Sequence, residues 1–193
     1  MEFHGIFNQT ILPGSEYTEV LTYYIYKSLV EDLLTVASAH TATLAIHPEK
    51  ISLDEIFDTI VDTFQPVVTD RGITIIADGH DLHVWADPVR TRQILINLVK
   101  NSIMHGNTLT LIEITATQKN NKEISIIVKD NGQGMDKEKT KKISKGQTNT
   151  SGYKGWGLGL SIVRMLAEMQ GGCFNFQHSG TGVVAELILP QKK

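Results

Sequence analysis

The chain of 193 residues is long enough for one full domain with an additional segment. Hydrophobic residues make up 41% and charged residues 20%, which is ordinary for a globular protein, and the net charge of -3 gives no reason to expect a nucleic-acid partner. The single cysteine, Cys173, excludes an internal disulfide, and its place at the start of an apolar strand pattern predicts a small buried residue.

No apolar run approaches the ~20 residues that cross a bilayer, and the N-terminus lacks the basic and apolar regions of a signal peptide. The sequence therefore predicts a cytoplasmic segment that makes no membrane contact of its own. If the parent protein is a membrane sensor, its anchor lies outside this segment.

A long helix is predicted first, over residues 17–45, between a Pro-Gly-Ser turn and Pro48. Apolar side chains recur along it at the three- and four-residue steps of a seam. They include Val20, Tyr23, Tyr24, Val30, Leu34 and Ala37. The chain has few other residues near this helix that could cover the apolar stripe, so the stripe needs a partner helix. We therefore expect a homodimer through this segment.

Capping residues and apolar patterns predict the remaining helices and strands. Ser52 begins a capping box, which predicts a helix over 52–69, and Asp87 followed by Pro88 predicts a second helix that ends at Gly106. Further along, we expect a strand over 73–76, paired strands over 109–117 and 123–129, a helix over 160–169, and two final strands over 173–177 and 183–189.

Asn97 and Asn101 lie four residues apart and share one face of the second of these helices. Their amide oxygens suit Mg²⁺, which takes few protein ligands and completes its shell with water and phosphate oxygens. A solvent-facing pair explains the two residues equally well when they are taken alone. Helix interiors disfavour asparagine by roughly a few tenths of a kcal/mol, however, so the pair needs a reason.

Asp130 follows an apolar strand and should lie at the end of a sheet. A carboxylate accepts hydrogen bonds, and the exocyclic amine of adenine donates them. Gly132 and Gly134 let the backbone turn tightly and a flat ring approach closely. Taken alone, the pattern fits a tight Asp-Asn-Gly turn better than a binding site.

Gly155, Gly157 and Gly159 precede the helix predicted from Leu160. Free backbone N–H groups and the positive end of the helix dipole make such a loop a phosphate site, although a flexible loop explains it nearly as well. A dinucleotide fold is excluded, because its fingerprint belongs in the first strand-to-helix turn and this one lies near the C-terminus.

Six lysines lie between Gly134 and Gly155. A cluster of this kind is usually a solvated surface. Beside a phosphate loop it also neutralises charge, and we expect Lys154 or Lys145 to contact the γ-phosphate.

In order and spacing, residues 93–105, 130–134 and 155–160 resemble the N, G1 and G2 boxes of the GHKL (Bergerat-fold) ATPases. Histidine kinases, type II topoisomerases, Hsp90 and mismatch-repair ATPases share this fold. The likeness runs over residues 52–190, and within the group it is greatest to the C-terminal kinase portion of two-component sensor histidine kinases.

The resemblance implies an α/β two-layer sandwich, in which helices cover one face of a mixed sheet, with an N-terminal helical segment. Residues 1–47 would be part of the dimerisation and phosphotransfer segment, and residues 48–193 the ATP-binding domain. The implied activity is that of a protein-histidine kinase, which binds Mg-ATP and transfers the γ-phosphate to a histidine. The aspartate of a response-regulator receiver domain would be the next acceptor.

By the same resemblance Asn101 and Asn97 hold Mg²⁺, Asn97 also takes part in catalysis, and Asp130 recognises adenine. The remaining residues expected around the nucleotide are His105, Gly132, Gly134, Lys154, Gly155, Gly157, Leu158, Gly159 and Leu160.

The chain departs from the kinase pattern in three places. Met104 stands where the N box commonly has a lysine, and the phenylalanine box between G1 and G2 is missing. No histidine is followed by the acid that orients a phosphoacceptor. His4 is a faint match to that motif, and the alternative is an acceptor on a segment outside this chain.

Two other functions remain open. A degenerate module of the same fold would bind nucleotide or a regulator without catalysis, and Met104 favours that hypothesis while the intact glycines oppose it. A serine kinase of the anti-sigma-factor type shares the fold, but its domain lacks a long dimerisation helix. Gyrase- or Hsp90-like ATPases would need further domains.

Overall fold

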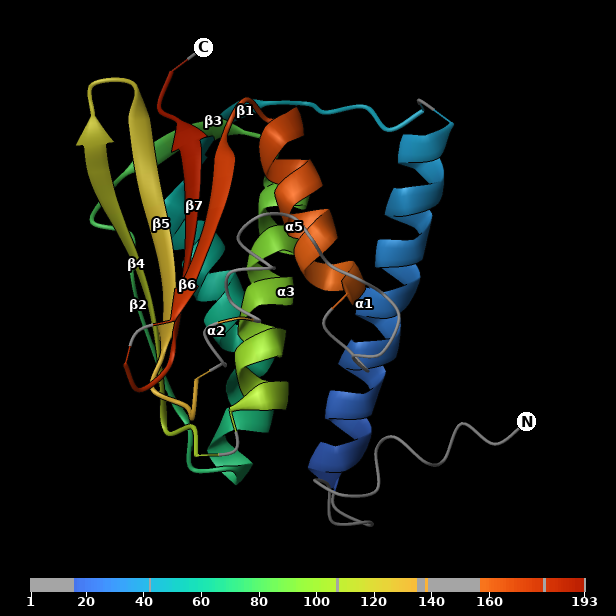
Figure 1. Ribbon diagram of the computed structural model, residues 1–193, viewed down its shortest axis with the longest axis vertical. Helices are drawn as coiled ribbons and strands as arrows, with labels where there is room; N and C mark the ends of the chain where they lie inside the picture. The colour runs from blue at the N-terminus through green and yellow to red at the C-terminus, as the bar shows by residue number, and fades with distance from the viewer. Residues whose placement is uncertain are drawn as a thin grey trace.

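A computed structural model of the chain describes residues 16–41, 43–106, 108–134, 138, 157–178 and 180–192. Figure 1 shows a five-stranded sheet, helices packed on one face of it, and the N-terminal helix outside them. The helices are α1 (Glu16–His40), α2 (Leu53–Asp70), α3 (Pro88–His105) and α5 (Gly157–Met169). The strands are β1 (Glu49–Ser52), β2 (Thr74–Asp78), β3 (His83–Ala86), β4 (Leu111–Asn120), β5 (Glu123–Asp130), β6 (Cys173–His178) and β7 (Val183–Pro190).

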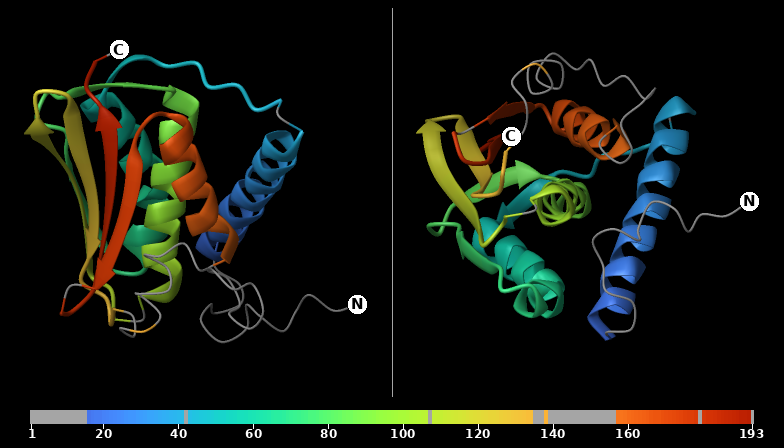
Figure 2. Two further views of the ribbon diagram at one scale, coloured as in Figure 1. Left: turned by 45° about the horizontal axis from the view of Figure 1, so that its top comes forward. Right: turned by 60° about the horizontal axis from the view of Figure 1, so that its bottom comes forward.

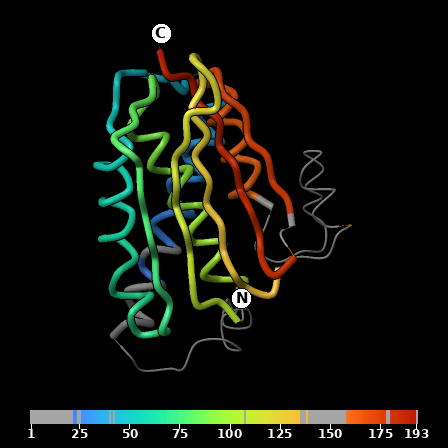
Figure 3. The backbone as a smooth tube through the Cα atoms, turned by 90° about the vertical axis from the view of Figure 1, so that its left-hand side faces the viewer, coloured from blue at the N-terminus to red at the C-terminus, as the bar shows by residue number. Residues whose placement is uncertain are grey.

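The main sheet, which Figure 3 shows face-on, has the strand order β2-β4-β5-β7-β6. Strands β2 and β4 are parallel, and the other neighbouring pairs are antiparallel. Helices α2, α3 and α5 cover one face of this mixed sheet, so the predicted α/β sandwich is confirmed. The ends of β5 and β7, which carry Asp130 and Val183, lie side by side in this sheet.

The two capped helix starts that the sequence predicted, those of α2 and α3, are confirmed. The Ser52 side chain accepts a hydrogen bond from the Glu55 amide at 3.5 Å and caps α2. Asp87 caps α3, because its Oδ1 accepts hydrogen bonds from the amides of Val89 and Arg90 at 2.9 and 3.1 Å. Helix α3 ends at His105, and Gly106 is its C-cap. These caps fix where the functional face of α3 begins and ends.

The N-terminal helix differs from its prediction in length. Helix α1 ends at His40 and not at residue 45. The last carbonyls are satisfied early, because the Thr41 hydroxyl bonds the carbonyl of Ala37 at 3.1 Å and the Thr43 amide bonds that of Ser38 at 2.9 Å. Figures 1 and 2 show α1 on the side of the helical layer away from the sheet.

Helix α1 turns polar side chains and Val36 toward the domain, and several of its large apolar side chains are exposed. Ser28, Asp32 and Thr35 are buried, with exposed fractions of 5%, 2% and 3%. Among the α1 side chains that the structure describes, the large apolar ones that are exposed are Tyr23, Tyr26, Leu29, Val30, Leu33 and Leu34. Val30 and Leu34 belong to the seam predicted from the sequence, and both are exposed.

Two parts of the fold differ from the sequence-based expectation. Strands β1 and β3, which form their own two-stranded antiparallel sheet, were not predicted. The prediction that Cys173 is buried is wrong, because Cys173 is exposed on the edge strand β6 and alternates with the buried Phe174 and Phe176. Within the described ranges, no helix combines the length and apolar character needed to cross a membrane.

Candidate nucleotide site

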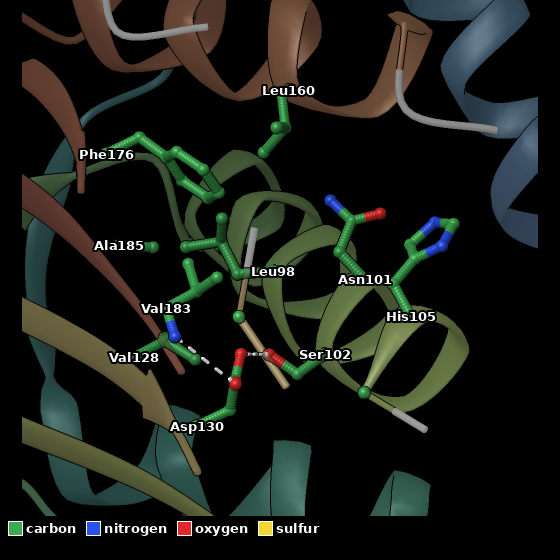
Figure 4. Close-up of a pocket in the computed structure, with 12 residues that line it drawn as sticks. Leu98, Asn101, Ser102, His105, Val128, Asp130, Leu160, Phe176, Val183 and Ala185 are labelled. Atoms are coloured by element: carbon green, nitrogen blue, oxygen red, sulfur yellow. Dashed lines mark hydrogen bonds between the residues drawn. The ribbon is translucent and has the colours of Figure 1, made fainter. Parts of the chain in front are cut away.

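Asp130 ends β5 with its side chain buried, 7% exposed, at one end of the sheet. Three donors hold its carboxylate. The Ser102 hydroxyl donates to Oδ2 at 2.9 Å, and the Gly132 and Val183 amides donate to Oδ1 at 3.0 and 3.3 Å. Figure 4 shows the carboxylate between the Ser102 and Val183 partners. A carboxylate has about four acceptor sites, so this one can accept a further hydrogen bond from a ligand.

The pocket next to Asp130 has apolar walls and a few polar groups, which is the composition of a site for a flat heterocycle. The apolar walls come from α3, α5 and three strands of the sheet. They are Leu98, Val128, Leu160, Phe176, Val183 and Ala185. The polar groups at the pocket include Asn101, Ser102, His105 and Asp130, and Figure 4 shows Asn101 and His105 together on α3.

The glycine turn after β5 packs against the end of α3. A Cβ atom on Gly132 would lie 3.0 Å from the Gly106 Cα and 3.2 Å from Asp130 Oδ1. Gly134 also lines the pocket. The absence of a side chain at Gly132 thus lets the turn approach the end of α3, a contact that the sequence did not predict.

Helix α5 begins against the two asparagines of α3. A Cβ atom on Gly159 would lie 3.2 Å from Asn97 Oδ1 and 3.9 Å from Asn101 Nδ2. The start of the glycine-rich helix and the asparagine face therefore meet at one place. Asp130 and Asn101 line one pocket with Leu160, so the three motifs come from distant parts of the chain to a single site.

One detail of the glycine motif differs from its prediction. Gly157 and Gly159 lie inside α5 and not in a loop before it. Leu158, Gly159 and Leu160 thus belong to the first helical turn, whose backbone N–H groups have no partner within the helix. This turn can still bind phosphate. His4, Lys145, Lys154 and Gly155 lie outside the described residues.

Asn97 Oδ1 is an acceptor that can bind a cation, whereas Asn101 Nδ2 is a donor that can bind a phosphate oxygen. Across the part of the chain that the structure describes, Asn97 Oδ1 and Asn101 Nδ2 are buried and have no hydrogen-bond partner. The same part holds no group of three or more His, Cys, Asp or Glu side chains that could bind a metal ion. A Mg²⁺ held here would take few ligands from the protein, which is the usual behaviour of this ion.

Asn97 also contacts α1, which sequence reasoning missed. Its Nδ2 donates to Asp32 Oδ1 at 3.0 Å, and the Asp32 carboxylate lies 3.8 Å from the ammonium of Lys100. Burial lowers the pKa of the Lys100 ammonium, although the charges of Asp32 and Glu31 act to raise it. Asn97 is fully buried and is not among the residues at the pocket next to Asp130.

Ser102 is a second functional residue that the sequence analysis missed. It lies four residues after Leu98, and this spacing alone could have placed it on the face of α3 that lines the pocket. No sequence signal connects Asp32 with Asn97, because that contact joins residues 65 positions apart.

Comparison with known proteins gives the same fold. Residues 86–193 match the family described as histidine kinase-, DNA gyrase B-, and HSP90-like ATPase. The adaptive-response sensory kinase SasA of Crocosphaera subtropica is 26% identical over 169 residues, covering 79% of this chain and 44% of SasA. SasA of Prochlorococcus marinus strain SARG is 31% identical over 152 residues, covering 76% of this chain and 40% of the relative. The chain thus spans less than half the length of these curated relatives.

Among solved structures, the catalytic domain of histidine kinase ThkA is 28% identical with a TM-score of 0.65, and the match covers 75% of this chain and 96% of that domain. The structure of ThkA in complex with the response regulator protein TrrA is 24% identical with a TM-score of 0.66, and covers 94% of this chain and 53% of that one. The family match covers more than half of the chain, and it includes Asn97, Asp130 and all of α5. This chain therefore belongs to the histidine kinase-, DNA gyrase B- and HSP90-like ATPase family.

Proposed function

We propose that this chain is the ATP-binding part of a protein-histidine kinase, which binds Mg-ATP and transfers the γ-phosphate to a histidine. The observation that carries the proposal is the buried carboxylate of Asp130. This carboxylate faces an apolar pocket. The glycine turn that follows Asp130 and the start of α5 also line that pocket. The similarity to the catalytic domain of ThkA supports the kinase assignment over other members of the family.

Asp130 recognises adenine in this proposal. Its carboxylate is fixed by Ser102 and by two backbone amides, so one free acceptor site is held in a constant direction. The adenine amine donates to that site, and the ring lies between apolar side chains such as Phe176 and Leu160. A site built to pair with an amine rejects a base that lacks it, because the carboxylate would be left without its partner.

The triphosphate extends toward the first turn of α5 and the asparagine face of α3. The free N–H groups of Leu158, Gly159 and Leu160 bind phosphate oxygens, and His105 lies at the edge of the same pocket. Asn101 and Asn97 would hold Mg²⁺, which supplies charge neutralisation to the phosphates when bound. Phosphoryl transfer needs mostly positioning, so few side chains have to do covalent chemistry.

The partners follow from the same proposal. The acceptor histidine is His4 or lies on a segment outside this chain. The structure of ThkA with the response regulator TrrA supports a response-regulator receiver domain as the next acceptor. The exposed apolar stripe of α1 supports a homodimer through residues 1–47, with residues 48–193 as the ATP-binding domain. The single cysteine, which is free, fits a reducing compartment, and we propose the cytoplasm as the location.

The proposal is tested first by nucleotide binding. Calorimetric titration with Mg²⁺ and a non-hydrolysable ATP analogue should show saturable binding, and Asp130→Ala should raise the dissociation constant by about tenfold or more. Asp58→Ala, at an exposed carboxylate of α2, is the matched control and should bind as the wild type does. Equal affinities of Asp130→Ala and the wild type would refute the adenine assignment.

Transfer is tested with γ-labelled ATP and Mg²⁺, followed by acid and base treatment. Label that is lost in acid and stable in base indicates phosphohistidine. Acid-stable, alkali-sensitive label would support a serine kinase. Binding without transfer, even to an added segment that carries a phosphoacceptor histidine, would support the non-catalytic module.

A further inference from the structure

The interface between α1 and α3 is polar although it is buried. Ser28, Asp32 and Thr35 of α1 are each at most 5% exposed. Their partners on α3 are Gln93, Asn97 and Lys100. Buried polar groups require partners of matching chemistry, so the contact between these helices is specific in register as well as in position.

Asp32 is the centre of this interface. Its Oδ1 accepts hydrogen bonds from Gln93 Nε2 at 3.1 Å and from Asn97 Nδ2 at 3.0 Å. Its Oδ2 lies 3.8 Å from Lys100 Nζ, which donates to the Ser28 hydroxyl at 2.6 Å. One carboxylate of α1 thus contacts three side chains on one face of α3.

The contact with Asp32 fixes the direction of the Asn97 amide. A carboxylate only accepts hydrogen bonds, so it selects the nitrogen of Asn97 and not the oxygen. Because the two atoms lie on opposite sides of the amide, the oxygen must point away from α1. It points toward α5, where a Cβ atom on Gly159 would lie 3.2 Å from it.

We propose that Asp32 is a positioning residue for the nucleotide site, and that docking of α1 sets the affinity for Mg-nucleotide by holding Asn97 Oδ1 toward the first turn of α5. This inference rests on the proposed function, since it assumes that Asn97 and the start of α5 hold the metal and phosphates. When α1 moves away, the amide of Asn97 is free to rotate, and an acceptor oxygen is no longer held in place. By reciprocity, bound Mg-nucleotide favours the docked position of α1.

The inference has a structural alternative, in which Asp32 only holds α1 against the domain. The two readings differ in the expected effect of removing Gln93, which is one of the two other partners of Asp32. Gln93→Ala removes one hydrogen bond from the same carboxylate and weakens the same interface, but it leaves the Asp32–Asn97 bond intact. A purely structural role would make nucleotide binding fall in Gln93→Ala as well as in Asp32→Ala.

The experiment measures dissociation constants for the Mg²⁺ complex of a non-hydrolysable ATP analogue and, separately, for adenosine without metal. We expect Asp32→Ala to weaken binding of the Mg²⁺ complex roughly five- to tenfold and to leave adenosine binding unchanged, because adenosine contacts only the Asp130 pocket. Asp32→Asn, which keeps an acceptor oxygen, and Gln93→Ala should both stay within about twofold of the wild type. In an Asn97→Ala background, Asp32→Ala should have no further effect.

Equal affinity of Asp32→Ala and the wild type for the Mg²⁺ complex, or an equal loss in the presence and absence of Asn97, would overturn the inference. So would an equal loss in Gln93→Ala. If Asp32→Ala fails to fold by circular dichroism, Asp32→Asn against Asp32→Leu makes the same comparison with a side chain of similar volume.

Hydrogen exchange of the Asn97 side-chain amide, followed by NMR, tests the contact without nucleotide. The amide protons should be protected in the wild type and in Gln93→Ala, and unprotected in Asp32→Ala. Unprotected amide protons in the wild type would refute the contact itself. A wild type that binds neither adenosine nor the Mg²⁺ complex would instead refute the proposed function, and the coupling with it, even where the amide is protected.

Discussion

Gly182 lies so close to Asp130 that a Cβ atom on residue 182 would be 1.9 Å from the Asp130 carbonyl oxygen and 3.1 Å from its Oδ1. No side chain fits at such distances, so only glycine allows the start of β7 to approach the end of β5 here. The next residue, Val183, donates its amide to Asp130 Oδ1 at 3.3 Å. The last hairpin of the chain therefore shapes the site whose central carboxylate comes from a different hairpin.

Gly182→Ala should damage both the fold and the site. The added methyl group forces β7 away from β5, which should lower the free energy of unfolding by about 1–3 kcal/mol. It should also break the Val183 contact with Asp130 and abolish binding of the ATP analogue. Chemical denaturation and calorimetric titration measure the two effects.

Gly180→Ala is the matched control for this substitution. Gly180 has a φ of +55°, but a Cβ atom there would meet no atom within 4 Å. It should lose about 1–2 kcal/mol of stability through backbone strain alone and retain nucleotide affinity. The steric argument for Gly182 fails if both variants bind the nucleotide as tightly as the wild type.

Ser102→Ala should weaken nucleotide binding without unfolding the protein. The Ser102 hydroxyl is one of three donors that hold the Asp130 carboxylate, at 2.9 Å from Oδ2. Its loss leaves a carboxylate that can rotate away from the adenine amine, and we expect the dissociation constant to rise about five- to tenfold. Titration of the variant with the ATP analogue measures this change.

Ser102→Thr keeps the hydroxyl and is the conservative control. It should restore most of the affinity if the hydrogen bond to Asp130 is the cause. A loss in Ser102→Thr as large as that in Ser102→Ala would assign the effect to packing and not to the hydroxyl.

The parts of the fold that the sequence predicted are those with local causes. Asp87 and Pro88 specify a helix start within two residues, and the alternation around Asp130 identifies a strand without knowledge of its neighbours. Strands β1 and β3 have four residues each, and they exist because Glu49–Ser52 pairs with His83–Ala86 across an intervening helix and strand. No pattern within either segment reveals that pairing.

The residues of the site also fall into those that local motifs predicted and those that depend on distant contacts. Asn101, Asp130 and Leu160 were expected from their motifs, and all three line one pocket. The contact of Asn97 with α1 was not expected, because the apolar stripe of α1 predicts only the face that meets a partner helix. Asp32 lies on the opposite, polar face, and a buried carboxylate in a surface helix has no sequence signature of its own.

Glu186 should make the stability of the sheet depend on pH in the acid range. Burial raises the pKa of the Glu186 carboxyl, but hydrogen bonds from Asn175 and Ser125 and the charge of Lys119 together lower it below its ordinary value of 4.5. The folded state therefore favours the charged form. The stability that this gives is fully present above about pH 4.5 and is lost as the pH falls through the lowered pKa.

Denaturation of the wild type and Glu186→Gln across this range measures the effect. The difference in the free energy of unfolding between them should shrink as the pH falls from about 6 to about 3. Ser125→Ala, which removes the hydrogen bond of 2.7 Å to Glu186 Oε1, should show an intermediate pH dependence. Parallel curves for the wild type and Glu186→Gln would contradict the assignment.

Leu33→Glu should disrupt self-association if α1 is the dimer interface that we propose. Leu33 is 54% exposed and lies among the large apolar side chains of α1 that face away from the domain. Exposed apolar stripes on a helix bury themselves against a matching surface, and a charge at the centre of that surface would be left without a partner. Light scattering after size exclusion should give a dimer for the wild type and a monomer for Leu33→Glu.

Ile76→Glu is the control for a new charge at an exposed apolar position. Ile76 is 51% exposed on β2, on the sheet and away from α1, so this variant should remain a dimer. Because the contacts of Asp32 with α3 lie on the other face of α1, Leu33→Glu should also keep the affinity for the Mg²⁺ complex of the ATP analogue. A monomeric wild type, or a Leu33→Glu variant that dimerises as the wild type does, would show that the exposed stripe of α1 has another role.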